Sequence, residues 1–181
     1  MTETENSSNT IFYFKGTCAC KRMSYECTEL PSCVSTCHCI TCRTLSGGPY
    51  QTYADVHSKS ITFYDTAEHL RYEGLPKDSI GGIQFLRLTK LGERAYCVAC
   101  HTPLAMRYKH EDHVTGLALG TVDEGSFLGN EKTKEALTPQ MHIFVSQKVW
   151  WVDLSKDALP AHQRFRGDFE ANMTASEGKE G

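Results

Sequence analysis

The cysteines constrain this chain more than any other feature of its sequence. There are nine in 181 residues, and seven of them form three tight groups. The first group is Cys18 and Cys20, the second is Cys37, Cys39 and Cys42, and the third is Cys97 and Cys100. The opening residues MTETENSSNT lack the basic and apolar stretches of a secretory signal, so we expect a cytoplasmic protein with reduced thiols. Clustered cysteines in such a protein bind metal more often than they form disulfides.

The spacing within each group indicates where the sulfur atoms point. Side chains at positions i and i+2 of an extended strand lie on one face, so the two cysteines of the first group can bind one ion. The same holds for Cys37 and Cys39, and His38 between them is expected to face away. Cys42 can close a third contact around a turn, and the Cys-x-x-Cys spacing of the third group suits a turn that holds one zinc ion.

The number of ligands separates two kinds of site. Structural zinc takes four protein ligands, whereas catalytic zinc takes about three and leaves a position for water or substrate. The first and third groups together predict a closed site, and the second group predicts an open one. The closed site would join segments roughly 80 residues apart and restrict the unfolded chain. All-structural zinc with a non-cysteine fourth ligand, an iron–sulfur cluster and disulfides stay open as alternatives, and Cys27 and Cys33 are expected to be buried small hydrophobic residues.

The remaining sequence is typical of a mainly β protein. Hydrophobic residues make up 40% and charged residues 23%, a globular balance. Short runs of β-branched and aromatic residues alternate with turn signals, which favours an all-β sandwich or barrel-like fold. We predict strands at residues 11–14, 23–27, 50–56, 61–64, 70–72, 83–88, 104–108, 114–119, 142–145 and 150–152, and helical turns at 131–137 and 155–159.

One domain is predicted, over residues 11–165. Residues 1–10 and 166–181 are mostly polar and small, so we expect both ends to be disordered. No stretch reaches the ~20 apolar residues that a membrane-spanning helix needs. The net charge of −3 argues against a nucleic-acid partner, and a homo-oligomer is left open.

Three segments resemble the motifs of one family. They are GTCAC at residues 16–20, CHCITCRTLSG at residues 37–47 and YCVACHTPL at residues 96–104. Their order and internal spacing are similar to the G-x-C-x-C, C-H-C-x-x-C-R-x-x-S-G and C-x-x-C-x-x-P-L patterns of the glutathione-dependent formaldehyde-activating enzymes, a family that includes centromere protein V. Two later segments, GTVD at residues 120–123 and HIFV at residues 142–145, also fit the pattern of this family.

The resemblance implies antiparallel sheets stapled by zinc, a fold described as a β-tent. It implies a structural zinc on the first and third groups and a catalytic zinc on the second, so two Zn²⁺ ions per chain. Typical members join formaldehyde and glutathione into S-hydroxymethylglutathione, formally a carbon–sulfur lyase reaction in reverse. Lys21, Val98-Ala99 and His101 stand where family members often have glycine, which indicates a divergent member.

The chemistry of a three-cysteine site favours thiol binding over water activation. Three anionic sulfurs make zinc a poorer Lewis acid than three neutral histidines would, and a thiol in the fourth position is bound as the thiolate. We therefore predict a zinc-dependent carbon–sulfur lyase that acts on glutathione or another thiol adduct, with a small thiol and an aldehyde as partners. The alternatives are a non-catalytic interaction module like centromere protein V, or zinc that only staples an enzyme whose chemistry lies elsewhere.

Two further residues are candidates for the site. His142 is predicted to act as a proton donor or second-layer partner near the open zinc, with a half-buried strand histidine as the alternative. Arg43 is predicted to pair with a carboxylate of glutathione, with a surface or structural arginine as the alternative. We expect the cavity walls to come from residues 72–82 and 123–139, and we expect Trp150-Trp151 in the core or at the cavity rim.

Overall fold

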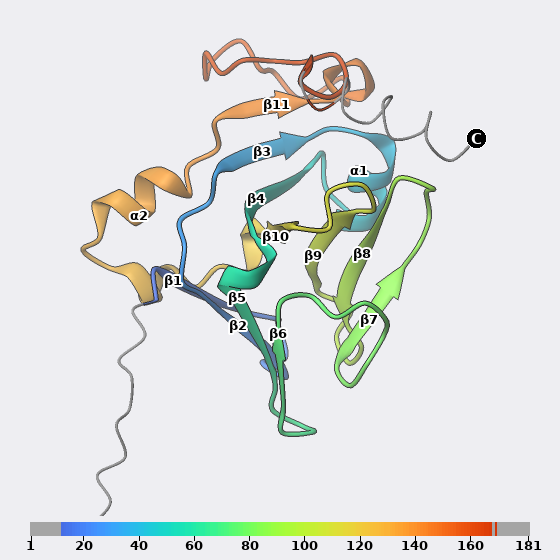
Figure 1. Cartoon of the computed structure of the whole chain (residues 1–181). Coiled ribbons are helices and arrows are strands. Elements are labelled where there is room, and N and C mark those ends of the chain that lie inside the picture. The colour runs from blue at the N-terminus through green and yellow to red at the C-terminus, as the bar shows by residue number, and fades with distance from the viewer. Residues whose placement is uncertain (1–11, 168, 170–181) are drawn as a thin grey trace, which may run out of the picture.

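Two β-sheets make up most of the computed structural model, which describes residues 12–167 and 169 (Figure 1). The strands are β1 (Phe14–Thr17), β2 (Met23–Cys27), β3 (Cys33–Cys37), β4 (Gln51–His57), β5 (Ile61–Asp65), β6 (Leu70–Glu73), β7 (Ile83–Leu86), β8 (Gly92–Cys97), β9 (Pro103–Tyr108), β10 (Val114–Ala118) and β11 (Met141–Ile143). The helices are α1 (Ile40–Ser46) and α2 (Glu131–Ala136), with short 3₁₀ turns η1 (Ser58–Ser60), η2 (Leu119–Thr121), η3 (Glu124–Phe127) and η4 (Val145–Gln147).

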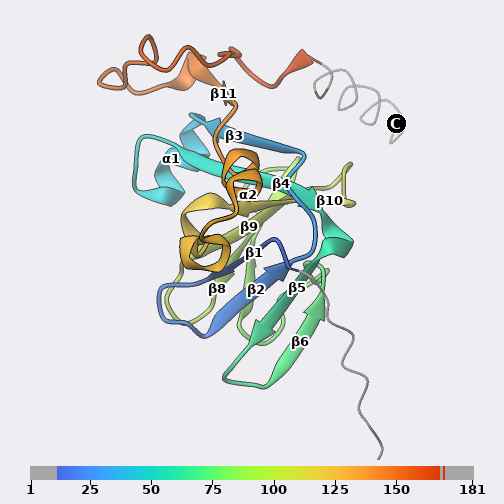
Figure 2. The same cartoon turned by 90° about the vertical axis from the view of Figure 1, so that its left-hand side faces the viewer.

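The smaller sheet has the strand order β1-β2-β5-β6, and the larger has the order β11-β3-β4-β10-β9-β8-β7. Neighbouring strands are antiparallel except β11 and β3, which run parallel. Figure 2 shows β11 and the segment that follows it on the far side of the larger sheet from β1, β2, β5 and β6. The mainly β fold predicted from the sequence is confirmed.

The main hydrophobic core lies between the two sheets. On β2, Met23, Tyr25 and Cys27 alternate with more exposed residues and point into it. On β4, Ala54 and Val56 face the same core. Because strand side chains alternate, the residues between them on β4 face the other side of the larger sheet. That second face carries its own cluster, which contains Cys37, Cys42, Tyr53, Met106 and Ala118.

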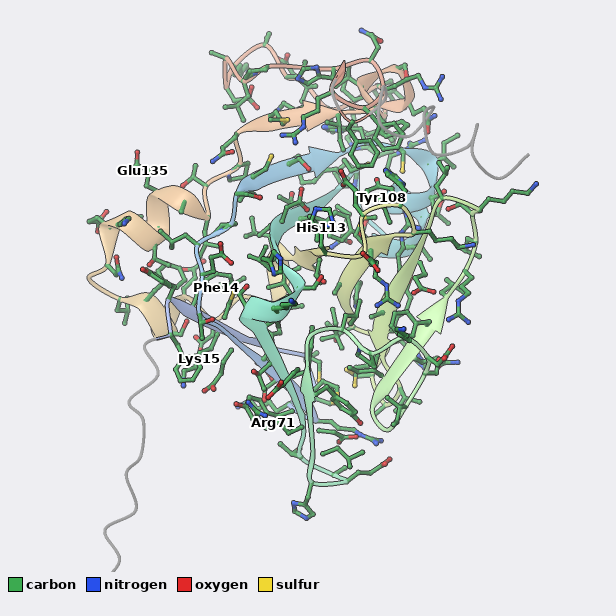
Figure 3. The ribbon with its side chains drawn as sticks, in the orientation of Figure 1. Phe14, Lys15, Arg71, Tyr108, His113 and Glu135 are labelled. Carbon is green, nitrogen blue, oxygen red and sulfur yellow. The ribbon has the colours of Figure 1, made fainter. Side chains whose placement is uncertain are left out.

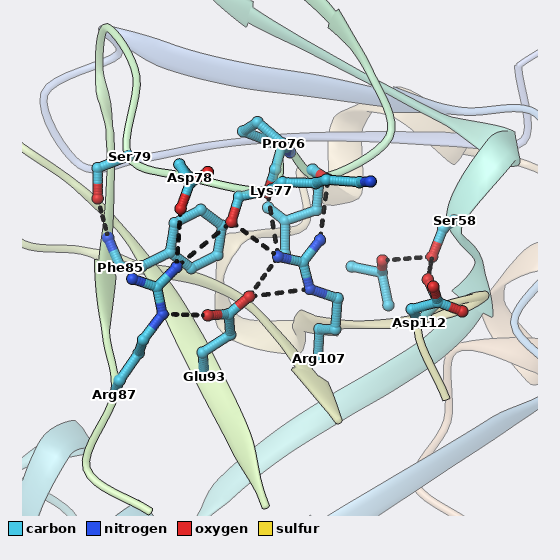
Figure 4. A network of polar contacts seen from close by, with 12 residues as sticks. Ser58, Pro76, Lys77, Asp78, Ser79, Phe85, Arg87, Glu93, Arg107 and Asp112 are labelled. Atoms are coloured by element: carbon cyan, nitrogen blue, oxygen red, sulfur yellow. Dashed lines mark hydrogen bonds and ion pairs between the residues drawn. The ribbon is translucent and has the colours of Figure 1, made fainter. Parts of the chain in front are cut away.

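Two strands, β3 and β8, were not predicted because apolar and polar residues do not alternate along their sequences. All five residues of β3, CVSTC, are buried, since it lies between β4 and β11. On β8, the buried carboxylate of Glu93 is neutralised by two arginines (Figure 4). Arg87 Nε donates to it at 2.6 Å and Arg107 Nε at 3.1 Å, and Arg107 also donates to the backbone oxygen of Leu75. Charged residues can therefore occupy a buried strand when they pair.

Other expectations were wrong or fall outside the described residues. Residues 150–152 and 155–159 form turns and loops, not a strand and a helix. Trp150 and Trp151 are 86% and 61% exposed, so they are not core residues. The helical turn expected at 131–137 is confirmed as α2, whereas α1 was not predicted. The disorder predicted for residues 1–10, and for 168 and 170–181 of the tail, lies outside the described residues.

Candidate metal centre

The first and third cysteine groups meet at one place. Cys18 follows β1, Cys97 ends β8, and the four sulfur atoms of these groups all lie within 4.8 Å of one another. Cys18 Sγ lies 3.5 Å from Cys20 Sγ, which lies 3.7 Å from Cys97 Sγ. Burial raises the pKa of Cys18 to about 12. Such close-packed thiols suit a thiophilic cation, which stabilises their ionised form.

The turns that carry these four cysteines require unusual backbone angles. Lys21 has φ 62° and His101 has φ 58°, in the left-handed region that favours glycine. These are two of the positions where glycine is common in the family that the sequence resembles. Lys21 and His101 therefore keep the turn conformation that glycine would adopt, at the cost of a strained backbone at each residue.

The second group forms a separate cluster on the other face of the larger sheet. Cys37 ends β3, Cys39 is the N-cap of α1, and Cys42 lies in its first turn. Their sulfur atoms lie within 4.8 Å of one another, and Cys39 Sγ accepts the backbone N–H of Cys42 at 3.3 Å. Gly47, with φ 67°, ends the short helix in the left-handed region. The C-x-x-C spacing thus becomes a helix start, not the simple turn expected.

The three thiols compete for ionisation. Hydrogen bonds from Cys37 and Cys42 lower the pKa of Cys39 to about 2. The same hydrogen bond to Cys39 raises the pKa of Cys37. Only one thiolate is favoured at this spacing unless a cation offsets the repulsion among all three, so this donor set also fits a thiophilic metal ion.

A cavity of about 470 Å³ adjoins this three-cysteine cluster. Its lining contains all three sulfur-bearing residues of the cluster and none of the four-cysteine cluster. The other residues that line it and matter here are aromatic (Tyr53, Tyr108, Phe144, Phe165 and Phe169) or charged (Asp55, Arg94, Glu111 and Arg166). The larger sheet forms one wall, and the residues after β11 form another. The three-cysteine cluster therefore borders a cavity, whereas the four-cysteine cluster lies outside it.

The aromatic wall is built by residues far apart in sequence. The Phe169 ring lies 4.7 Å from Tyr108 and 4.5 Å from Phe165, and Phe144 lies 4.6 Å from Phe165. Figure 3 shows Tyr108 beneath the segment that follows β11, away from Phe14 on the smaller sheet. The walls expected from residues 72–82 and 123–139 are wrong for this cavity. Residues 123–139 instead border a second cavity of about 400 Å³ beside α2.

Charged residues stand at both ends of the cavity. Asp55 on β4 pairs in register with Cys33, four residues before Cys37 on β3. That spacing corresponds to roughly 13 Å along the strand. Burial raises the pKa of Asp55 to about 6, with Glu111 adding to the rise and Arg166 opposing it. At the cysteine end, Arg94 Nη2 donates to Cys42 Sγ at 3.6 Å.

The structure places His142 behind the cysteine loop. Its neighbours Met141 and Ile143 line the cavity, and His142 faces the opposite side of β11. His142 Nδ1 lies 3.0 Å from His38 Nε2, and His142 Nε2 lies 2.8 Å from Asp157 Oδ2. Burial, followed by the nearby His142, lowers the pKa of His38 to about 4. His38 thus links the cysteine loop to His142. The catalytic role expected of His142 stays a prediction.

Arg43 and the tryptophans do not line the cavity. Arg43 lies on α1, and its buried Nε has no hydrogen-bond partner among the described residues. Its predicted pairing with glutathione stays a prediction. Cys27 and Cys33 are buried, as expected, and neither is part of the three-cysteine or the four-cysteine cluster. Sequence reasoning missed Arg94, for which the sequence holds no signal beyond its place three residues before Cys97.

Comparison with known proteins identifies the family. Residues 13–147 match the family described as glutathione-dependent formaldehyde-activating enzyme (GFA). The chain belongs to this family. Glutathione-dependent activation of formaldehyde is therefore the activity that its family suggests.

Two other comparisons add less. A solved protein of Rhodobacter sphaeroides, a structural genomics target, is similar to this chain with a TM-score of 0.46 and 16% identity, covering 61% of this chain and 88% of that chain. No curated protein matches the sequence. Within residues 12–167 and 169, neither α1 nor α2 nor any other helix has the length and apolar character to cross a membrane.

Proposed function

We propose that this GFA-family protein is a zinc-dependent enzyme that forms or cleaves the carbon–sulfur bond of a thiol adduct, formally a carbon–sulfur lyase. The observation that carries the proposal is the position of the three-cysteine cluster at the end of a cavity large enough for a tripeptide thiol. A three-ligand cluster that reaches a cavity is the arrangement expected of a catalytic zinc, whereas four ligands are typical of a structural one.

The donor sets indicate which residues would hold each ion. The four-cysteine cluster would hold a structural zinc that joins the β1–β2 turn to the β8–β9 turn and staples the proposed β-tent fold. Cys37, Cys39 and Cys42 would hold the catalytic zinc. When bound there, zinc supplies a Lewis acid that favours the thiolate form of a nearby thiol.

The residues of the chain would bind and orient the rest of the substrate. The aromatic wall that contains Tyr108, Phe144 and Phe165 would limit water in the cavity. Glutathione carries an ammonium group and two carboxylates. Asp55 and Arg166 offer groups of opposite charge at the far end of the cavity.

The proposed reaction adds a thiol to an aldehyde. The thiol loses its proton, and the sulfur forms a bond to the carbonyl carbon. The π electron pair moves to the carbonyl oxygen, which takes up a proton, so no oxidant or reductant is needed. The reverse reaction releases the thiol and the aldehyde. Because both substrates and the reduced cysteines belong to a thiol-rich compartment, we place the activity in the cytoplasm.

Metal analysis and one pair of variants test this function. Purified protein should carry two zinc ions per chain and should form S-hydroxymethylglutathione from glutathione and formaldehyde. Cys42→Ser should lose one ion and at least ~100-fold in activity while it stays folded. Cys33→Ser is the matched control, because Cys33 lines the same cavity without belonging to the cluster. Full activity in Cys42→Ser would refute the catalytic role.

The non-catalytic alternative is a module like centromere protein V. The family match to an enzyme family does not favour it. A homo-oligomer stays a prediction.

A further inference from the structure

Arg94 is a buried cation beside the open cysteine cluster. It lies on β8, lines the cavity and is only 8% exposed. Its Nη2 donates to Cys42 Sγ at 3.6 Å, and its buried Nε donates to no acceptor among the described residues. One donor of the guanidinium, Nε, is therefore left unsatisfied among the described residues.

Arg94 also differs from other arginines of the sheets in its counter-ion. Arg107 pairs with Glu93, and Arg22 pairs with Asp65. Among residues 12–167 and 169, no carboxylate lies within ion-pairing distance of Arg94. A buried charge is costly unless it is paired. The anionic groups that reach Arg94 are thus the sulfurs of the cluster, and the counter-charge has to come from there.

Simple charge counting shows what this pairing would do, given the function proposed above, on which this inference rests. Three thiolates and one Zn²⁺ have a net charge of −1. A neutral fourth ligand leaves that charge unchanged, whereas a thiolate raises it to −2. In a partly dry cavity the second negative charge is strongly disfavoured without a nearby cation.

We propose that Arg94 makes the three-cysteine site select an anionic fourth ligand, the thiolate form of its substrate, over neutral ligands. Arg94 offsets one negative charge at Cys42, so that the site with a bound thiolate has a local charge of −1 instead of −2. A purely structural Arg94, which only holds Cys42 in place, would affect charged and neutral ligands equally. The two roles therefore differ in a measurable ratio.

The test compares two small ligands on protein loaded with Co²⁺ at both cysteine clusters. The first ligand is 2-mercaptoethanol, which carries no charge except that of its thiolate, and the second is neutral imidazole. Binding at the three-cysteine site is followed by the Co²⁺ absorption spectrum, with the four-cysteine site as an unchanged internal reference. Arg94→Met should weaken 2-mercaptoethanol binding by about tenfold or more. Imidazole binding should change by less than about threefold.

Charge-retaining and donor-retaining variants complete the design. Arg94→Lys should bind 2-mercaptoethanol within about threefold of the wild type, because the charge remains. Arg94→Gln keeps an N–H donor for Cys42 without the charge, so it should behave like Arg94→Met and serves if that variant does not fold. Equal weakening of both ligands, or unchanged 2-mercaptoethanol binding in the uncharged variants, would overturn the proposal. A wild-type protein that holds no metal at the three-cysteine site would instead refute the proposed function, and the Co²⁺ content measured before ligand is added shows which has failed.

Discussion

The two cysteine clusters place the same side chain in different surroundings. The four-cysteine cluster is assembled from two turns far apart in sequence, with Cys18 and Cys97 buried. The three-cysteine cluster is local, since β3 and the first turn of α1 supply all its sulfur atoms. It borders a cavity, and Arg94 reaches it from β8. One cluster brings together cysteines from distant segments of the sequence, and the other borders a cavity.

This difference shows that ligand number alone does not make a site reactive. The surroundings of the three-cysteine cluster include a cavity, a buried arginine that donates to Cys42, and the contact between His38 and His142. The four-cysteine cluster instead depends on strained turns at Lys21 and His101. The predictions below test whether the clusters are as distinct as these surroundings indicate.

The largest expected effect is on stability. Cys97→Ser should lose the metal of the four-cysteine cluster and more than about 4 kcal/mol of unfolding free energy, because structural zinc contributes directly to folding. Cys42→Ser should lose the other metal and less than about 2 kcal/mol. Denaturant titration with parallel metal analysis measures both. Equal losses of stability would mean that the clusters share one structural role.

A second test uses acid. Asp65 is fully buried and accepts two hydrogen bonds from Arg22, which lies in the turn of the four-cysteine cluster. These bonds lower the pKa of Asp65 below the usual value of an aspartate. Its contribution to stability is therefore complete above the unfolded pKa and is lost as the pH falls through the lower folded value. Asp65→Asn should cost about 3 kcal/mol at pH 7 and should flatten the loss of stability below about pH 4.

The matched control for Asp65 is a second carboxylate on the same arginine. Glu68 lies 2.8 Å from Arg22 Nη2 but is half exposed. Glu68→Gln should cost less than about 1 kcal/mol in thermal melts between pH 2.5 and 7. If Glu68→Gln costs as much stability as Asp65→Asn, burial does not explain why the Arg22–Asp65 pair is the stronger of the two.

A smaller effect is expected behind the open cluster. His142→Asn removes the contact with His38 and should weaken metal binding at the three-cysteine cluster by about 10–100-fold, as partners of metal-binding loops commonly do. Metal affinity at the four-cysteine cluster should not change. Competition with a chelator measures both affinities. Asp157→Asn keeps a hydrogen-bond acceptor for His142 and should have a smaller effect; loss at both clusters together would indicate general unfolding instead.

The smallest effect concerns backbone strain. His101→Gly should stabilise the protein by about 0.5–1 kcal/mol, because glycine adopts the left-handed conformation without a steric penalty. Gly47→Ala, at the left-handed end of α1, should destabilise it by about 1 kcal/mol. Thermal unfolding at fixed metal content measures both changes in stability, which should have opposite signs. A destabilised His101→Gly would mean that the imidazole makes a contact worth more than the strain.

The sequence supported local predictions better than distant ones. Strands with alternating apolar residues, such as β2 and β5, were found because one face of each is buried. β3 and β8 were missed because central position and ion pairing, not apolar side chains, allow their burial. The sequence also singled out His142, whose role stays a prediction; the side of β11 that it occupies depends on the parallel pairing with β3.

By itself, the sequence determined how seven cysteines divide between two clusters, because the spacing of the cysteines fixes which sulfur atoms can point together. It also carried the family, through motifs of a few residues each. Only the tertiary structure decided which cluster meets a cavity, which arginine faces its sulfur atoms and which histidine supports it from behind. Those relations join strands separated by tens of residues, and they follow from sheet order and packing, which no local pattern specifies.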